Sequence, residues 1–510
     1  MKVKIDRDAD KPLYAQIRDA VLEAVESRAL KPGDQLPPVA VFAKDLGVTQ
    51  ATIRRAYEDL TKSRHLCCQV GRGTFVGDPE ESGPEESSFE PSAETHGYSP
   101  GEAQARQAAR RLRRGIAQSL ENLMAFTLRP GLINFTSGIP DPAIAREGIL
   151  DDMVREALQA GQGLYQASGD PLGMWDLRRE LAERFTREGA KVSPDQILIT
   201  NGSQQALSLM AQAELEEGRR VLCETPCYLG APGAFGSLGL FVEAVSRDHD
   251  GPTPERLARF RDGRPSLLYL CPDLHSPMGL DLGPERRRLV VQWAREQNSL
   301  LLADEIYRDL RFEGPPLASF LVDPGLDTAV VVGSLSKSFM GGLRVGWLIA
   351  GVDRIRTLAP LKRAMDLACP PLMQAAALAL LRTGEYDLHL ERGRRHNLAR
   401  RDAVLTALKR HMPDGVAWTV PKGGFHMWVE LPAGYSSIAL FLMAVERGVS
   451  FIPGPNLDLD HRFVNAFRLS YGSVGVEQIR EGIELLAFAV KELLKEPPGD
   501  PGLGGLGAFL

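Results

Sequence analysis

An acidic, proline-rich segment at residues 78–104 divides this chain into parts that must fold separately. The segment reads DPEESGPEESSFEPSAETHGYSPGEAQ and carries eight acidic residues with no lysine or arginine. It holds too few apolar side chains to offset the conformational entropy lost on folding. With 510 residues and 44% hydrophobic content, the rest of the chain is long enough for two or more packed domains. We therefore expect a linker between globular domains.

The composition on either side of this segment sets the expected domain boundaries. Five arginines between residues 106 and 114 follow the acidic stretch, and they suit either a solvated helix face or a phosphate-contacting one. The final stretch, EPPGDPGLGGLGAFL, is rich in proline and glycine and predicts a loose tail. The expected parts are an N-terminal domain at 1–77, a linker at 78–114, a second domain at 115–495 with a large subdomain at about 165–390 and a small one at about 391–495, and a tail at 496–510.

The chain carries no sign of a membrane segment or a metal site. No run of about 18 apolar residues occurs, and the N-terminus MKVKIDRDADK lacks the apolar stretch of a signal peptide, so we expect a soluble, cytoplasmic protein. The six cysteines lack the spacing and the neighbouring histidines of a zinc site, so we expect reduced, buried thiols. A net charge of -6 gives no sign of nucleic-acid binding by the whole chain, and any such signal must be local.

Ahead of the linker, the sequence has the pattern of three helices followed by a hairpin. Pro12 opens a helical pattern in PLYAQIRDAVLEAVES, a second short helix is predicted at VAVFAKDL, and Thr49 is placed to cap a third, TQATIRRAYEDLTKS. Ile53, Tyr57 and Leu60 share the inner face of that third helix. The glycines of VGRGTFV suit a hairpin turn. This order predicts a winged helix-turn-helix domain.

Beyond the linker, short apolar runs alternate with amphipathic helical segments. The runs QILIT, RVLCE, SLLYL, SLLLAD and TAVVVGS are largely apolar, as expected for strands buried on both faces. The alternation predicts an α/β domain, in which a mostly parallel sheet carries helices on both faces and a smaller α+β subdomain follows at the C-terminal end.

Lys337 lies where such a sheet binds its ligands. It follows the run TAVVVGS directly, at the carboxyl end of a predicted strand. The stretch GSLSKSFMGGLRVGWL places Ser334 and Ser336 before it and Arg344 after it. The serines and the arginine can donate to a phosphate, while the lysine amine can form an imine with an aldehyde. Pyridoxal 5'-phosphate carries both groups, and we predict it as the cofactor.

Other positions supply what that cofactor would need. Asp304 ends the run SLLLAD and is placed to pair with a protonated ring nitrogen, a contact worth about 4 kcal/mol at about 4 Å and an effective dielectric constant of about 20. Tyr307 follows within reach of the ring hydroxyl. The remaining candidates are Gly202, Ser203 and Gln204 for the phosphate, Tyr228 for stacking on the ring, and Arg468 for a substrate carboxylate.

In combination, these motifs resemble those of the fold-type I aminotransferases. From about residue 132 to 490 the chain is similar to the subgroup of aromatic and 2-aminoadipate transaminases, through LYQASGDPLGMWDLR, ITNGSQQAL, CETPCYLG, PDLHSPMG, LADEIY, SLSKSFMGGLRVG and FRLSYG in that order. The resemblance implies that Lys337 forms the internal aldimine, that Asp304 pairs with the ring nitrogen and that Tyr307 contacts the ring hydroxyl. It also implies phosphate contacts from Ser334, Ser336 and Arg344, and a homodimer in which Tyr165 reaches the phosphate of the other subunit.

One motif departs from this family's pattern. Where these enzymes read N-P-T-G, the chain reads H-S-P-M-G, so His275 or Ser276 stands where an amide would contact the ring oxygen. An imidazole can donate a hydrogen bond there. We expect tuned rather than abolished chemistry, and this motif leaves the substrate preference open.

The N-terminal segment resembles the GntR-type winged helix, and the whole arrangement resembles the MocR group of bacterial transcription regulators. The match lies in PLYAQI, LKPGDQLP, LGVTQATIRRAYEDL and GRGTFV. It implies that the third helix enters the major groove of an operator and that the wing approaches the minor groove. The candidate DNA contacts are Thr49, Thr52, Arg54 and Arg55 on the helix and Arg72 on the wing.

Three substitutions within that pattern bear on DNA binding. The family's LPSxRxLA is LPPVAVFA here, which puts Pro38 and Ala40 in place of a serine and an arginine, and Gln50 replaces a further arginine. Each lost phosphate contact lowers the affinity and its salt dependence. Residues 1–77 still carry a net charge of about +3. Weakened DNA binding and a relict domain kept as a scaffold or dimer contact are both open interpretations.

Two functions are consistent with these features. In the first, the protein is a transcription regulator whose aminotransferase-like domain forms an aldimine with an amino compound as effector. In the second, it is a working aminotransferase that converts an amino acid and a 2-oxo acid, with a relict winged helix. Both begin with the reaction of an amine at Lys337.

Overall fold

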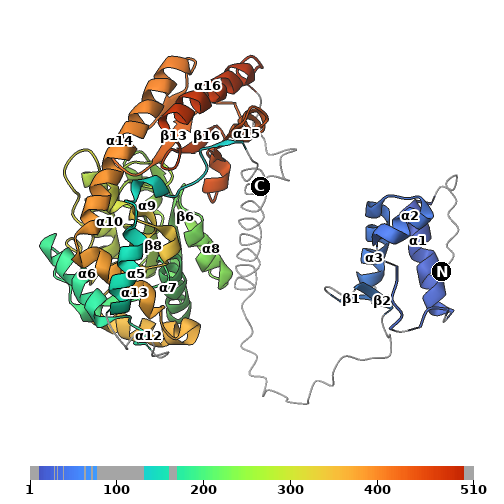
Figure 1. The fold of residues 1–510 in the computed structure, drawn as a ribbon, viewed down its shortest axis with the longest axis horizontal. Helices are drawn as coiled ribbons and strands as arrows, with labels where there is room; N and C mark the ends of the chain where they lie inside the picture. The colour runs from blue at the N-terminus through green and yellow to red at the C-terminus, as the bar shows by residue number, and fades with distance from the viewer. Residues whose placement is uncertain are drawn as a thin grey trace. The chain divides into compact units, whose positions relative to one another are not determined.

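The computed structural model describes residues 11–27, 29–31, 33–37, 39–62, 65–69, 73–76, 131–159 and 169–498 (Figure 1). They form two compact units, one within residues 1–97 and the other within residues 98–510. The arginine-rich segment at 106–114 lies outside the described residues. In the part of the chain that is described, no helix is both long enough and apolar enough to cross a bilayer.

The first unit consists of three helices and a hairpin, as predicted. Its elements are α1 (Leu13–Glu26), α2 (Val39–Leu46), α3 (Gln50–Lys62), β1 (Leu66–Gln69) and β2 (Gly73–Val76), and the two strands pair antiparallel. The predicted inner face of α3, formed by Ile53, Tyr57 and Leu60, is buried against α1 and α2. At the start of α3, the hydroxyl of Thr49 accepts a hydrogen bond from the backbone N–H of Thr52 at 3.3 Å, which confirms the predicted cap.

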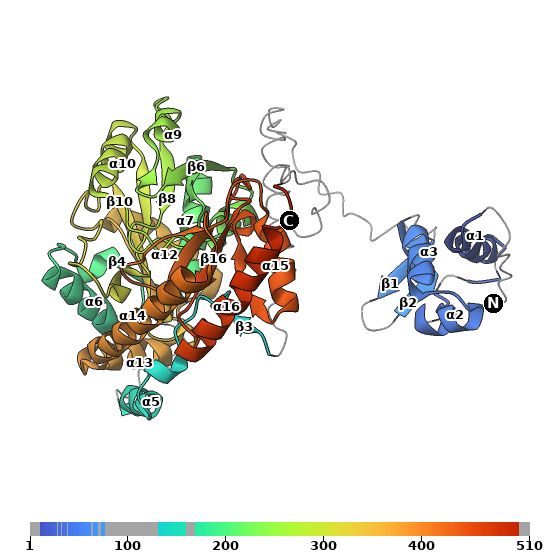
Figure 2. The same cartoon turned by 90° about the horizontal axis from the view of Figure 1, so that it is seen from above.

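The second unit is built on an eight-stranded mixed sheet with the order β4-β11-β10-β9-β8-β5-β6-β7 (Figures 1 and 2). Its strands are β4 (Ile197–Thr200), β5 (Arg220–Thr225), β6 (Val242–Asp248), β7 (Gly251–Pro252), β8 (Ser266–Leu270), β9 (Leu300–Asp304), β10 (Ala329–Ser334) and β11 (Gly346–Ile349). The five predicted runs all form strands. β6, β7 and β11 were not predicted, and β11 runs antiparallel to both β10 and β4.

Alternate residues of the strands enter two separate cores. Leu301 and Ala303 of β9 pack with one set of helices, whereas Leu300 and Leu302 pack with another. The first set is α5 (Ile149–Gln159), α6 (Trp175–Arg187), α10 (Pro284–Glu296) and α13 (Pro371–Arg382), and the second is α7 (Ser203–Glu217), α8 (Gly230–Ser237) and α12 (Val352–Asp366). Because both sides of each strand are buried, the strand sequences are largely apolar.

A smaller subdomain holds an antiparallel sheet with the order β12-β13-β16-β15. Its elements are β12 (Ala417–Trp418), β13 (His426–Glu430), β15 (Ile452–Pro453), β16 (Ala466–Ser470), α14 (Glu385–His411), α15 (Ser437–Glu446) and α16 (Val476–Leu493). Figure 1 shows α14 and α16 side by side over these strands, in agreement with their contacts. The short strand β3 (Ile133–Asn134) pairs with β14 (Val449–Ser450), so the segment after β3 begins beside this subdomain.

Candidate functional site

Six strands of the large sheet end at the same edge, among them β6, which is parallel to β5. β5, β8, β9 and β10 are parallel to one another, and β4 runs in their direction because both β4 and β10 pair antiparallel with β11. Gly202, Tyr228, His275, Asp304 and Lys337 all lie at or just after these strand ends. The topology therefore brings together residues that are up to 135 positions apart, at the edge where open α/β sheets bind ligands.

Lys337 lies on the short helix α11 (Leu335–Ser338), which continues from β10. Its Nζ donates a hydrogen bond to the backbone carbonyl of Gly138 at 2.6 Å. Burial and the nearby positive charge of Arg468 lower the pKa of Lys337 to about 8, while the carboxylate of Asp304 acts in the opposite direction. An amine with a lowered pKa is neutral, and thus nucleophilic, in a larger fraction of molecules near pH 7.

Asp304 is the last residue of β9 and is almost completely buried. Its Oδ2 accepts a hydrogen bond from the hydroxyl of Tyr269 at 2.9 Å, and its Oδ1 accepts one from the backbone N–H of Ile306 at 3.4 Å. Burial raises the pKa of Asp304 to about 6, although these hydrogen bonds and the charge of Lys337 favour the ionised form. A cationic group placed beside this carboxylate would stabilise its charged state further.

Tyr307 contacts a residue that the sequence did not single out. Its hydroxyl lies 3.0 Å from Nε2 of His426, and Nδ1 of the same ring lies 2.8 Å from Oγ of Ser470. His426 begins β13, so this contact joins the two subdomains. Burial and the charges of Arg468 and Lys337 lower the pKa of His426 well below its usual value, so the ring is neutral.

Arg468 lies on β16, and its side chain is also buried. One terminal nitrogen, Nη2, donates a hydrogen bond to the backbone carbonyl of Thr136 at 2.7 Å. Its Nε is buried without a hydrogen-bond partner among the described residues. Burial lowers the pKa of Arg468 to about 10, which leaves the guanidinium charged at neutral pH. A buried cation with spare donor capacity is suited to a carboxylate ligand.

The turn between β4 and α7 forms a cradle of backbone and arginine donors. Gly202 has a φ of +79° and precedes the first residue of α7, Ser203. Nη2 of Arg344 donates to the carbonyl of Asn201 at 2.8 Å, and a Cβ atom added to Gly202 would lie 2.7 Å from that nitrogen. Only glycine therefore lets Arg344 lie so close to the turn.

The serines and the aromatic residue predicted for this site lie on its other sides. The hydroxyls of Ser334 and Ser336 are 2.9 Å apart, at the start of α11. The Tyr228 hydroxyl donates to Oε1 of Gln204 at 3.0 Å, and its ring is partly exposed. Burial raises the pKa of Tyr228, and the charge of Asp304 adds to this effect. Tyr228 therefore lies within electrostatic range of the carboxylate at the end of β9.

The two residues predicted for the ring oxygen face different neighbours. Ser276 lies close enough to Tyr307 to favour the ionised form of its hydroxyl, although burial raises the pKa of Tyr307 overall. His275 is fully buried instead, with its Nε2 3.5 Å from a carboxylate oxygen of Glu224. Burial and the charge of Arg247 lower the pKa of His275 well below its usual value.

The predicted DNA contacts are only partly described. Thr49 and Arg55 are exposed, and Thr52 is half-buried. The guanidinium of Arg55 lies 4.0 Å from the centre of the Tyr14 ring, so this arginine also packs against α1. Arg54 occupies a position on α3. Arg72 of the predicted wing and Tyr165, predicted to reach the phosphate of another subunit, lie outside the described residues.

Both units match known families. Residues 130–486 match the family described as aminotransferase class I and II, and residues 13–76 match the bacterial regulatory proteins of the gntR family. The chain is 34% identical over 385 residues to the 2-aminoadipate transaminase of Thermus thermophilus, an alignment that covers 74% of this chain and 95% of that protein. It superimposes with a TM-score of 0.69 on the multiple substrate aminotransferase of Thermococcus profundus, with 29% identity, 74% of this chain and 95% of the other covered.

Several relatives share both parts of the chain. The probable rhizopine catabolism regulatory protein MocR of Rhizobium meliloti is 26% identical over 498 residues, which cover 95% of each chain. The alignment includes both the gntR-type segment and the aminotransferase-like one. The two proteins are therefore similar in their whole domain arrangement. This chain therefore belongs to the class I and II aminotransferase family and carries an N-terminal domain of the gntR family, the combination that gives it the arrangement of the MocR-type transcription regulators.

Proposed function

We propose that this regulator holds pyridoxal 5'-phosphate at Lys337 and responds to an amino acid whose carboxylate is bound by Arg468. The observation that carries the proposal is the convergence of three charged groups, the buried Asp304 and Arg468 and the half-buried Lys337, which influence one another's pKa values or share a neighbour. Groups with perturbed pKa values that gather at a strand-end site are typical of ligand chemistry.

The side chains at this edge of the sheet fit a phosphorylated pyridine aldehyde. Gly202 leaves room for Arg344 at the start of α7, where backbone N–H groups and the helix dipole favour an anion. Asp304 is a buried carboxylate with a raised pKa, which suits a protonated ring nitrogen. When bound, the cofactor supplies an aldehyde for reaction with amines and a ring that withdraws electrons.

Three side chains of the protein would have separate roles at this site: Lys337, Tyr307 and Arg468. The neutral form of Lys337 can accept a proton at Nζ and return it, because its pKa of about 8 lies near the working pH. Tyr307 is held by His426 and can donate toward an oxygen on the ring. Arg468 can orient an amino acid by pairing with its carboxylate in place of the Thr136 carbonyl.

Complete transamination is a second candidate function. It is favoured by the 34% identity to a 2-aminoadipate transaminase and by a lysine that retains its carboxylate neighbour Asp304. A regulator needs only the first amine exchange at this site, whereas an enzyme needs a repeated proton transfer at Lys337 and the entry of a 2-oxo acid. The two activities are compatible in one protein.

Cofactor spectroscopy with ligands tests the proposal and separates the two candidates. The purified full-length protein, loaded with pyridoxal 5'-phosphate, is mixed with a panel of amino acids, with and without 2-oxoglutarate. A single spectral change without turnover is expected for a regulator, and steady product formation for an aminotransferase. A Lys337→Ala variant should lose the absorbance near ~420 nm that an imine to lysine produces. Unchanged spectra in that variant would exclude Lys337 as the attachment point.

DNA binding requires its own measurement. The proposed operator contacts on α3 predict that the full-length protein retards a DNA fragment from upstream of its own gene at low salt. Absence of a retarded band at low salt would favour the alternative, a winged helix kept as a scaffold. The proposed homodimer is checked in the same preparation by light scattering.

A further inference from the structure

A second recess in the same unit is lined by residues other than those of the candidate site around Lys337. It is a groove of about 760 Å³ between α6, the segment that follows Arg308, and the first half of α14. This volume lies within the range of small-molecule sites, which is about 300–1,000 Å³. Five arginines line the groove, namely Arg184, Arg308, Arg311, Arg394 and Arg395.

Three of these arginines are already neutralised by carboxylates. The ion pairs are Arg184 with Asp387, Arg308 with Glu188, and Arg311 with Asp281. In each of these three pairs, the negative charge of the carboxylate offsets the positive charge of the arginine. The remaining two arginines, Arg394 and Arg395 on α14, are the groups in the groove that are best placed to bind an anion.

Arg394 and Arg395 retain unused hydrogen-bonding capacity. Nε of Arg394 donates to the backbone carbonyl of Asp309 at 2.9 Å, and its two terminal nitrogens make no hydrogen bond or ion pair with the described residues. Arg395 lies 3.9 Å from Glu391, and both side chains are mostly exposed, so this pair is weak. A guanidinium that is anchored through Nε presents its terminal donors as a fork, which matches the oxygens of a carboxylate or phosphate.

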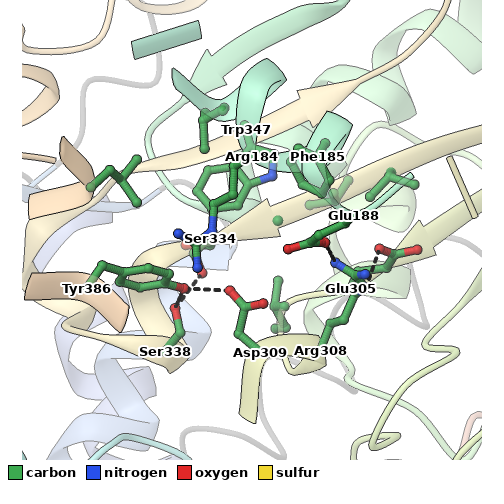
Figure 3. A pocket seen from close by; sticks show the side chains of 16 residues that line it. Arg184, Phe185, Glu188, Glu305, Arg308, Asp309, Ser334, Ser338, Trp347 and Tyr386 are labelled. Carbon is green, nitrogen blue, oxygen red and sulfur yellow. Dashed lines mark hydrogen bonds and ion pairs between the residues drawn. The ribbon is translucent and has the colours of Figure 1, made fainter. Parts of the chain in front are cut away.

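A small inner cavity adjoins the groove and shares Arg184, Arg308, Glu188 and Asp309 with it (Figure 3). The cavity measures about 30 Å³ and is lined by buried polar atoms that lack a hydrogen-bond partner among the described residues. These atoms are Nε1 of Trp347, Nε of Arg308 and Oε2 of Glu305. Nε of Arg308 and Oε2 of Glu305 lie 3.9 Å apart, which is too far for a direct hydrogen bond. A polar cavity of this size has room for about one water molecule, which could bridge these groups.

The groove is linked to the helix of Lys337 by direct contacts. The hydroxyl of Tyr386 lies 2.7 Å from Oδ2 of Asp309 and 2.8 Å from Oγ of Ser338, the residue after Lys337 (Figure 3). Asp309 in turn receives the hydrogen bond from Arg394. A ligand held by Arg394 would therefore be connected to Ser338, the neighbour of Lys337, through the backbone and side chain of Asp309 and the side chain of Tyr386.

We propose that this groove binds a small organic molecule with two or more anionic groups, either carboxylates or phosphates, through Arg394 and Arg395. The ligand is distinct from the amino compound at Arg468, because the groove shares none of Lys337, Asp304, Tyr307 or Arg468. Three features of the groove support this choice: the terminal nitrogens of Arg394 that are free among the described residues, the neighbouring positive charge of Arg395 and the volume of the groove.

Titration calorimetry on the full-length protein tests the site with two probes, citrate for carboxylates and pyrophosphate for phosphates. Ionic strength is held constant with sodium chloride. We expect saturable binding of at least one probe, and the probe that binds identifies the anion class. The Arg394→Gln/Arg395→Gln variant should bind it at least tenfold more weakly. The matched control is Arg356→Gln, a change at an exposed arginine on α12 that does not line the groove.

A second variant separates a loss of binding from a folding defect caused by the change at Arg394. Arg395 is 70% exposed, so Arg395→Glu should fold normally and should weaken binding by placing a negative charge at the groove. Absence of saturable binding for both probes, or equal affinities in Arg395→Glu and the Arg356→Gln control, would overturn the proposal.

Discussion

His426 joins the two subdomains through a pair of hydroxyl contacts at its ring. With its pKa well below the usual range, the neutral ring offers one N–H donor and one acceptor nitrogen to Tyr307 and Ser470. Protonation would convert the acceptor into a donor and would place a further positive charge beside Lys337 and Arg468. The folded protein therefore resists protonation at this position.

This resistance predicts a pH dependence of stability. In the unfolded chain a histidine binds a proton below about pH 6.5, whereas folded His426 does not, so the unfolded state gains stability as the pH falls. Below pH 6.5, the wild type should lose up to about 1.4 kcal/mol of unfolding free energy per pH unit relative to His426→Gln. Urea unfolding at pH 7.5 and 5.5 measures the difference. His396→Gln, at an exposed histidine of α14, is the control and should show no such change relative to the wild type.

Lys337 offers a second test at the scale of single residues. Its amine should titrate near pH 8 in the cofactor-free protein, which can be followed through the pH dependence of its acylation by mass spectrometry. Asp304→Asn should move the midpoint to lower pH, because the carboxylate raises the pKa of Lys337. Arg468→Gln should move it to higher pH, because the guanidinium lowers it. Shifts in the same direction for both variants would contradict the electrostatic description of the site.

At the scale of elements, the β4–α7 turn depends on two glycines that let backbones approach. A Cβ atom on Gly346 of β11 would lie 2.7 Å from the backbone carbon of Gly202, so the antiparallel strand β11 can pack against the turn only without a side chain there. The turn and β11 thus fix the position of α7 relative to Arg344.

Gly202→Ala should reduce cofactor affinity at least about tenfold, because the new methyl group would displace Arg344. The control is Gly218→Ala at the other end of α7, where φ is +66° and nothing lies within 4 Å of the added Cβ. That change should lower stability by about 1 kcal/mol through backbone strain alone and leave cofactor affinity intact. Fluorescence titration with pyridoxal 5'-phosphate and urea unfolding provide the two readouts. Equal affinities in the two variants would argue against the cradle.

The elements themselves were predictable where burial alone determines the pattern. The five apolar runs became strands because each enters a core on both faces. β11 escaped prediction because its four residues, GWLI, follow Arg344 without the helix that separates parallel strands. Its antiparallel direction depends on pairing with β10 and β4, which local sequence does not specify.

For the whole molecule, the sequence allowed a prediction of where the candidate site lies. It did not allow a prediction of all the residues that contact the site. Lys337, Asp304 and Gly202 could be predicted because strand ends in an α/β sheet share one edge. His426, Tyr269 and Gly138 could not, because each reaches the site through pairing or packing that spans many residues. The hydrogen bond between Lys337 and Gly138, for example, joins positions 199 residues apart. No motif around Gly138 signals that contact.

The N-terminal unit allows a prediction about the whole molecule's affinity for DNA. Gln50 is exposed at the first position of α3, where the resembling regulators carry an arginine. Gln50→Arg should strengthen binding to the upstream fragment and steepen the slope of log K against log salt by about 0.9, the value for one added phosphate contact. Fluorescence anisotropy across a salt series measures both quantities. The control is Gln292→Arg, which adds the same charge at an exposed position of the aminotransferase-like unit. An equal effect in both variants would indicate nonspecific attraction only.

The segment that follows β3 has a consequence for every ligand of this protein. The carbonyls of Thr136 and Gly138 already engage Arg468 and Lys337, the two cations proposed to receive an amino acid and a cofactor. A ligand that binds these two side chains must lose its own hydration shell. It must also break their hydrogen bonds to the carbonyls of Thr136 and Gly138. These two carbonyls are part of every molecule of the protein and occupy donors that a ligand would use. The affinity of each ligand is therefore reduced by the free energy of breaking these two hydrogen bonds.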